Sequence, residues 1–237
     1  FKTKEGGKNV EKVILEDIPW KVEEGKFLRK LHLKEESEDA QRVKELLEEA
    51  KKVGRPRGMY GVAYIDKKGE DEVTIEGITF RSKVLRTNLE DTYRVFPFVA
   101  TSGKELEEWS GQFEDMLEAF WAAEIKEWVL SQALSHLLEN LKETFRLEKV
   151  AAMNPGSLPD WPMEEQKKLF ALLGEAAEKV GVRLTESCLM VPVKSVSGIW
   201  FPTRVSFENC QLCLRENCPG RRAPYDEQLA RKYRVRA

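Results

Sequence analysis

The chain has 237 residues, enough for one large domain or two small ones with a well-buried core. Hydrophobic residues make up 41%, charged residues 34%, and the formal net charge is −2, which favours a globular protein and excludes a strongly basic nucleic-acid binder. Charges such as Glu124 and Lys126 interrupt every apolar stretch before the ~20 residues that a bilayer requires. The first five residues contain no apolar signal core. We therefore expect a cytoplasmic protein with neither nucleic acid nor a membrane as a partner.

The first half of the chain predicts a mixture of short strands and helices. Apolar runs at 13–15 and 27–28 suit an entry segment or an edge strand. From 38 to 53 the apolar residues recur at helical spacing, and Gly54 with Pro56 ends this amphipathic helix. The remaining expected elements are a ribbon of strands at 59–65, 72–75 and 78–80, a helix at 82–89, a strand at 93–100 and a helix at 104–109.

The second half begins with the longest periodic segment, 111–145, which predicts one long central helix or two helices joined by a kink. A strand at 149–153 and a loop at 154–159 follow, and Asp160 with Pro162 indicates the cap and first turn of a helix that reaches Val180. Strands are expected at 189–191, 198–201 and 205–207, before a cysteine loop and a basic tail. We expect three parts, 1–110, 111–205 and 206–237, within one continuous α+β domain.

All four cysteines lie in the last 50 residues: Cys188, Cys210, Cys213 and Cys218. The two residues between Cys210 and Cys213 allow both thiolates to face one side of a tight turn, and Cys218 can complete that face. Cys188 is the remaining candidate for a fourth ligand. In a chain without a secretory signal, close cysteines more often bind metal or do redox chemistry than form structural disulfides.

Four thiolates satisfy either zinc or a 4Fe-4S cluster. Cys218 is followed by Pro219, a dipeptide frequent at iron–sulfur sites, and a second cysteine pair typical of zinc ribbons is absent from the sequence, so the pattern favours the cluster over zinc. Free thiols, disulfides and a site that merely fastens the terminal loop are the alternatives. Arg221 and Arg222 could stabilise the thiolates, bind an acidic ligand or partner, or be solvated surface residues.

Other patterns of catalytic chemistry are sparse. His32 and His136 are far apart in sequence, and neither has a metal-ligand companion nearby, so each is interpreted as a surface or packing residue. The chain contains no nucleophile elbow, phosphate-binding loop or glycine-rich dinucleotide motif. A conventional small-molecule methyltransferase, which needs such a glycine-rich first turn, is therefore disfavoured.

A longer motif carries a family resemblance. The run 184–201 contains Thr-Glu-Ser, then Met-x-Pro, then Ser-Val-Ser-Gly, and it ends on Phe201. This order resembles the signature of the activation domain of cobalamin-dependent methionine synthase. Upstream, 154–162 is similar to that family's Pro-Gly-Tyr loop, which also leads into a helix. The resemblance is strongest over 150–202 and extends to the rest of the chain through the order of its elements.

The resemblance implies an α+β domain with a curved antiparallel sheet and a long central helix. Family members bind S-adenosylmethionine in a shallow cleft and help to return inactive cob(II)alamin to methylcobalamin by reduction and methyl transfer. The implied partner is a corrinoid protein or a cobalamin-dependent methyltransferase, which supplies the cobalamin. The residues that would shape the cleft are Glu186, Ser187, Ser195, Ser197 and Gly198, together with Pro155, Gly156, Arg221 and Arg222, although turn and strand geometry explains several of these equally well.

Two departures from the family pattern matter. Ala151, Ala152 and Met153 stand where the family has an Arg that contacts the methionine part of S-adenosylmethionine, which predicts weak or absent binding. Beyond Pro202 the cysteine loop replaces the element that carries the family's ligand-binding Tyr. Our leading hypothesis is a stand-alone redox activator of a methyltransferase, in which a 4Fe-4S cluster donates the electron. The alternative is a non-catalytic module that binds a corrinoid protein or S-adenosylmethionine, with a structural zinc or cluster site.

Overall fold

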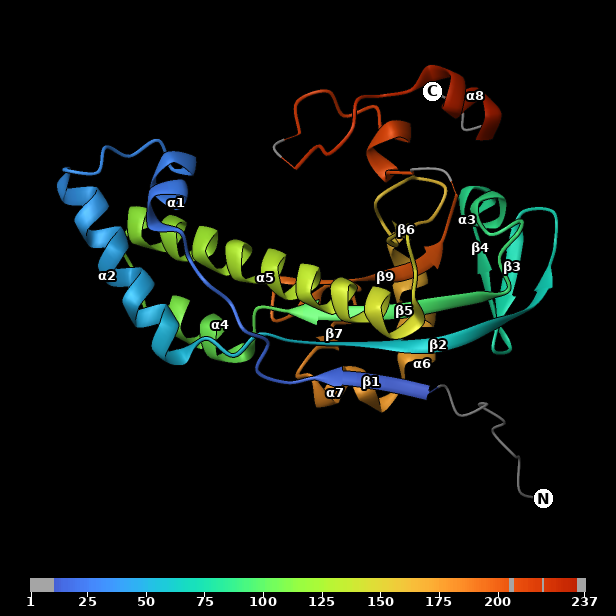
Figure 1. Ribbon diagram of the computed structural model, residues 1–237, viewed down its shortest axis with the longest axis horizontal. Helices are drawn as coiled ribbons and strands as arrows, with labels where there is room; N and C mark the ends of the chain where they lie inside the picture. The colour runs from blue at the N-terminus through green and yellow to red at the C-terminus, as the bar shows by residue number, and fades with distance from the viewer. Residues whose placement is uncertain (1–10, 205–206, 219, 234–237) are drawn as a thin grey trace.

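The computed structural model describes residues 11–204, 207–218 and 220–233, and an antiparallel sheet runs through its centre (Figure 1). Within these residues the sheet has seven strands in the order β4-β3-β2-β5-β9-β6, and β1 pairs with the other half of β2. Its strands are β1 (Glu11–Leu15), β2 (Arg57–Lys68), β3 (Glu72–Ile75), β4 (Ile78–Arg81), β5 (Arg94–Thr101), β6 (Val150–Met153) and β9 (Ser195–Pro202). A separate two-stranded ribbon joins β7 (Arg183–Leu184) to β8 (Met190–Val191).

Helices surround this sheet on both faces and at one end (Figure 1). They are α1 (Glu24–Lys30), α2 (Glu38–Val53), α3 (Lys83–Asn88), α4 (Lys104–Ser110), α5 (Met116–Phe145), α6 (Gln166–Leu173), α7 (Glu175–Lys179) and α8 (Glu227–Tyr233), with the short 3-10 turns η1 (Met163–Glu165) and η2 (Asn209–Leu212). None of these described helices combines the length and the apolar character needed to cross a membrane.

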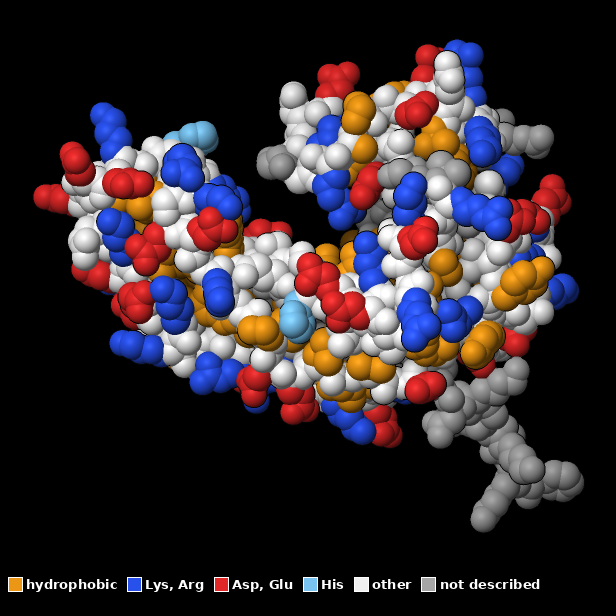
Figure 2. Space-filling model, in the orientation of Figure 1, with side chains coloured by type: hydrophobic (Ala, Val, Ile, Leu, Met, Phe, Trp, Pro, Cys, Tyr) orange, Lys and Arg blue, Asp and Glu red, His pale blue; other side chains and the backbone are white. Residues whose placement is uncertain are grey.

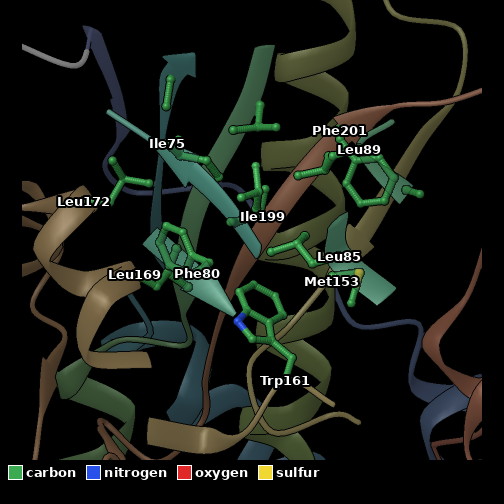
Figure 3. Packing of buried hydrophobic residues seen from close by; sticks show 14 of the residues in the cluster. Ile75, Phe80, Leu85, Leu89, Met153, Trp161, Leu169, Leu172, Ile199 and Phe201 are labelled. Atoms are coloured by element: carbon green, nitrogen blue, oxygen red, sulfur yellow. The ribbon is translucent and has the colours of Figure 1, made fainter. Parts of the chain in front are cut away.

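The alternation of side chains along the strands divides the core into two layers. Tyr60, Phe98 and Trp200 point to the face that α5 covers, where they pack with Leu137 and Leu141. Their neighbours on the same strands point to the opposite face and pack with α3, α6 and α7, as Figure 3 shows for Ile199 and Phe201. Because each strand contributes to both layers, the sheet fixes the position of α5 relative to α6.

The amino-terminal half of α5 extends past the sheet and packs against α1, α2 and α4. Asp115 caps this helix by accepting hydrogen bonds from the backbone N–H groups of Leu117 (2.9 Å) and Glu118 (3.0 Å). The start of β2 is joined to α4 by the guanidinium of Arg57, which forms a bidentate pair with Glu105, at 2.7 and 3.2 Å. Burial of Glu105 opposes its ionisation, but the hydrogen bond and charge of Arg57 outweigh burial and hold the Glu105 pKa below its usual value.

The structure confirms the predicted fold class and most of the periodic elements. The sheet is antiparallel, the helix at 38–53 has the expected bounds, and the segment predicted at 111–145 is one long helix that begins at Met116. The ribbon of strands at 59–65, 72–75 and 78–80 is also present, with β2 longer than predicted. These elements are predictable because local periodicity and local turn signals can be read directly from the sequence.

Two predicted elements are wrong. The run at 27–28 belongs to the helix α1, because its apolar side chains pack between helices and not on a sheet. The helix predicted from Asp160 to Val180 is broken into α6 and α7 at Gly174, whose φ of 59° lies in the left-handed region. Asp160 caps α3 instead, accepting from Ser82 Oγ and from Val84 N at 2.9 Å. Of the strand predicted at 205–207, residues 205 and 206 lie outside the described residues.

Candidate ligand-binding site

The site arises where the edge strand β6 ends and β9 continues. β6 pairs with β9 only over 199–202, so the segment Ser195–Ser197 has no strand partner on that side among the described residues. There the side-chain Nδ2 of Asn154 donates to the carbonyl of Ser197 at 2.8 Å, in place of a backbone N–H. Gly198 permits this close approach, because a Cβ atom at its position would lie 2.5 Å from both Asn154 Nδ2 and Met153 O.

The loop that leaves β6 is fixed by one buried tryptophan. Gly156, with a φ of 84°, donates its N–H to the carbonyl of Trp161 at 2.7 Å, which closes the loop on itself. The Trp161 ring is fully buried and meets Phe80 edge to face, with 6.2 Å between centroids. Figure 3 shows it among Phe80, Leu85 and Met153. The core under the sheet therefore anchors the Pro-Gly loop.

A hollow of about 420 Å³ lies between this loop, the sheet edge and α5. Its apolar part includes Phe98 and Trp200, whose rings stack 3.8 Å apart at an angle of 10°, and Leu134 and Leu138, one turn apart on α5. Figure 2 shows the surface hollowed between the carboxyl-terminal segment and the long helix. The other lining residues are Val150, Ala151, Ala152, Asn154, Pro155, Ser157, Met163, Gln166, Met190, Ser195, Val196, Ser197, Glu208 and Arg222.

The polar wall of the hollow consists mostly of neutral groups held in one network. Ser197 Oγ donates to Gln166 Oε1 at 2.9 Å, and both residues are buried. Asn209 Nδ2 donates to Asn154 Oδ1 at 3.3 Å, which joins the carboxyl-terminal segment to the Pro-Gly loop. This network fixes the direction of the polar groups, as a specific ligand site requires.

Charge is confined to one pair of side chains that the carboxyl-terminal segment contributes. Among the described residues that line the hollow, Glu208 and Arg222 are the charged ones, and Arg222 Nη2 lies 3.1 Å from Glu208 Oε2. Their side chains are 38% and 54% exposed, so the pair is within reach of solvent.

Arg221 holds the segment that carries this pair. Its guanidinium donates to the carbonyl oxygens of Cys210 and Cys213, each at 3.0 Å, and also to those of Arg215 and Ala223. At the far end of the segment, Tyr233 OH donates to Asn88 Oδ1 at 2.6 Å. Burial raises the pKa of this tyrosine. Arg221 thus braces the segment internally, and the buried side chains of Phe207, Leu212 and Tyr233 attach it to the core beneath the sheet.

The structure brings together part of the site expected from the sequence. Pro155, Ser195, Ser197 and Arg222 line the hollow. Gly156 and Gly198 shape its walls through the close contacts described above. The other expected residues do not line it: Glu186 and Ser187 occupy the exposed turn between β7 and β8, and Arg221 is bonded to backbone carbonyls.

The four cysteines occupy two different parts of the fold. Cys188 is buried in the β7–β8 turn, where its N–H donates to Thr185 O at 3.0 Å and its φ is 64°. Cys210 lies in η2, Cys213 follows η2, and Cys218 lies beyond, before Arg221. Over the described residues, which include all four cysteines, no three Cys, His, Asp or Glu side chains are grouped so as to hold a metal. The described structure therefore gives no support to the expected four-thiolate cluster.

Several lining residues were not identified from the sequence. Trp200 lies inside the signature. Side chains alternate between the two faces of a strand, so its position between Ile199 and Phe201 could have predicted that it faces α5. Asn154 precedes the Pro-Gly pair, a position where a side chain can replace a strand partner. Gln166 and Glu208 gave no signal, because only the tertiary fold brings them to the hollow.

The comparisons with known proteins concern the sequence of one segment and the fold of the chain. Residues 139–208 match the model of the family described as vitamin B12 dependent methionine synthase, activation domain. This segment contains the Pro-Gly loop, α6, β9 and Glu208. No curated protein matches the chain.

Among solved structures, the chain is similar to the one titled "Crystal Structure of the MetH Reactivation Domain bound to AdoHcy". The TM-score is 0.56 at 17% sequence identity, over 85% of this chain and 81% of that chain. At this identity the likeness establishes the fold, and the matched family segment lies at the centre of that fold. Residues 139–208 are therefore similar to the vitamin B12 dependent methionine synthase activation domain, and the chain as a whole shares the fold of the MetH reactivation domain.

Proposed function

We propose that this protein binds S-adenosylmethionine in the hollow beside β9 and presents its methyl group to the corrinoid of a cobalamin-dependent partner that has become inactive. The family match and the solved structure with bound AdoHcy support this proposal. The observation that carries it is the position of the hollow: the signature strand β9 and the Pro-Gly loop, both inside the matched segment, form its walls.

The lining has the chemistry that the nucleoside part of the ligand needs. Small-molecule sites usually have volumes of ~300–1,000 Å³ and apolar walls with a few placed polar groups. The hollow of about 420 Å³ combines the apolar side chains of Leu134, Leu138 and Trp200 with the neutral polar groups of Asn154 and Gln166. Apolar contacts suit the flat base, and the amide and hydroxyl groups can hydrogen-bond the ribose and the base edge.

In the proposed reaction this chain binds and orients the methyl donor. The partner's cob(II)alamin takes one electron from a separate one-electron reductant and the methyl group from S-adenosylmethionine, which leaves as S-adenosylhomocysteine. The electron-donor role expected from the sequence is not part of the proposal, because the cysteines of the described structure do not form a group of metal ligands.

Calorimetric titration with S-adenosylhomocysteine tests the proposed site. Ala152 lines the hollow, so Ala152→Leu places extra carbon atoms inside it and should weaken binding by about 10-fold or more through overpacking. Lys149→Leu makes a similar apolar change at an exposed side chain outside the hollow and should leave affinity unchanged. A wild-type protein that binds no S-adenosylhomocysteine at millimolar concentration would refute the proposal.

The partner role needs a separate assay. The protein, a cob(II)alamin-loaded candidate partner, S-adenosylmethionine and a chemical one-electron reductant are mixed without oxygen, and methylcobalamin is followed by its visible spectrum. We expect methylcobalamin to form faster with wild-type protein than with Ala152→Leu. Iron and zinc analysis of the same anaerobic preparation tests the cysteine cluster independently, since about four irons per chain would reinstate it.

A further inference from the structure

We infer that Glu208 and Arg222 form the subsite for the α-amino-acid end of the methyl donor, so that the cysteine-containing segment supplies the charged recognition that the sequence of β6 lacks. This inference rests on the proposed function, because it names the part of the ligand that these two residues bind. It departs from the expectation that S-adenosylmethionine binding would be weak.

The first argument is the charge of the hollow. The amino-acid end of the ligand carries a carboxylate and an ammonium group, and both need partners when they leave water. Ala151 and Ala152 of β6 line the hollow without offering any charge. Among the described lining residues, Arg222 is the cation and Glu208 is the anion, so they are the available partners for the two charges of the ligand.

The second argument is geometric. The two side chains lie 3.1 Å apart, so a zwitterion that replaces their mutual contact can place its carboxylate on the guanidinium and its ammonium on the Glu208 carboxylate. Glu208 is the N-cap residue of η2, and its side chain forms a reciprocal cap with Gln211. The backbone N–H of Glu208 donates to Gln211 Oε1 at 2.8 Å. The anionic group is therefore fixed next to the mouth of the hollow.

The third argument concerns Arg222. Its backbone N–H donates to Cys210 Sγ at 3.4 Å, and the preceding residue, Arg221, is bonded to four backbone carbonyls of the same segment. The backbone at Arg222 is thus held in place, while its side chain, 54% exposed, keeps the freedom to turn from Glu208 to a ligand. Cys210 and Arg221 act as positioning residues for this cation.

Two ligands that differ only at the amino-acid end test the inference. S-Adenosylhomocysteine has the zwitterionic end, and 5′-methylthioadenosine keeps the thioether nucleoside without it. In calorimetric titrations Arg222→Gln should weaken S-adenosylhomocysteine binding by about 10- to 100-fold and change methylthioadenosine binding by less than about twofold. Glu208→Gln should act in the same direction with a smaller effect, and Arg222→Lys should retain part of the affinity.

The control is Arg215→Gln, which removes a positive charge from the same segment at an exposed side chain outside the hollow and should leave both affinities unchanged. Thermal unfolding of each variant checks that the fold is intact. Equal loss of both ligands in Arg222→Gln, or no loss of either, overturns the inference while the proposed function stands. A wild-type protein that binds neither ligand overturns the proposed function and this inference together.

Discussion

Two walls of the same hollow are built in different ways. The wall formed by β9 and the Pro-Gly loop is held by backbone pairing with β5 and β6 and by a fully buried Trp161. The wall formed by the carboxyl-terminal segment, described over 207–218 and 220–233, contains the 3-10 turn η2 and the short helix α8. Arg221 braces it internally, and Phe207, Leu212 and Tyr233 pack it on the core. The comparison teaches that the apolar lining belongs to the sheet and to α5, whereas the charged lining sits on a segment without strand pairing, and we expect that segment to open locally before the sheet unfolds.

The largest expected effect on stability comes from a change in the wall formed by β9 and the Pro-Gly loop. Trp161→Ala removes a fully buried ring that packs on Phe80, and it should lower the free energy of unfolding by about 3–5 kcal/mol in chemical denaturation. Trp161→Phe is the matched control: it keeps an aromatic ring and deletes a buried indole N–H that has no hydrogen-bond partner in the described structure, so its cost should be clearly smaller. Equal losses in both variants would contradict the anchoring role.

A smaller effect is expected at the contact between β9 and the Pro-Gly loop. Gly198→Ala places a methyl group 2.5 Å from Met153 O and Asn154 Nδ2, so the loop must shift, at a cost of about 1–3 kcal/mol. Gly220→Ala lies in the other wall, where an added Cβ meets no atom within 4 Å, and should change stability by less than about 0.5 kcal/mol. Unfolding curves of the two variants compare the walls directly.

Loosening the carboxyl-terminal segment should have a local effect. Arg221→Met deprives the carbonyls of Cys210 and Cys213 of their donor, at a cost of about 1–2 kcal/mol. Hydrogen exchange followed by mass spectrometry should show faster exchange in residues 207–226 and unchanged protection in β9. Equal acceleration in β9 would mean that the two walls unfold as one unit.

The smallest expected effect is at the Arg57–Glu105 ion pair, which lies outside both walls. Because Arg57 holds the folded-state pKa of Glu105 below the usual 4.5, this carboxylate contributes stability at neutral pH that is lost as the pH falls through the depressed pKa. The pair should contribute about 1 kcal/mol. Arg57→Met should flatten the acid limb of the stability curve, measured as melting temperature from pH 6 to 3. An unchanged acid limb in Arg57→Met would contradict the stabilising role of the Arg57–Glu105 pair.

The difference between the walls also explains what the sequence could predict. The helix at 38–53 and the long α5 follow from apolar periodicity, and the Pro-Gly loop and β9 follow from a contiguous motif. Asp160 was misread because a cap can serve a helix distant in sequence, here α3. Arg222 was expected at the site because it follows the cysteines, whereas Glu208 meets the hollow only after the chain has folded over it, so no local pattern marks Glu208. Cysteine spacing indicates which thiols are neighbours in sequence, and it carries no information on the distance from Cys188 to η2.

The short β6 has a further consequence for the behaviour of the protein in solution. A sheet edge with free N–H and C=O groups invites strands of other molecules to add to it, which leads to aggregation. Beyond Met153 the edge of β9 is covered by the amide of Asn154 and by a loop whose Pro155 has no N–H to offer. The same few residues that leave space for a small molecule therefore also protect this stretch of the sheet from edge-to-edge association.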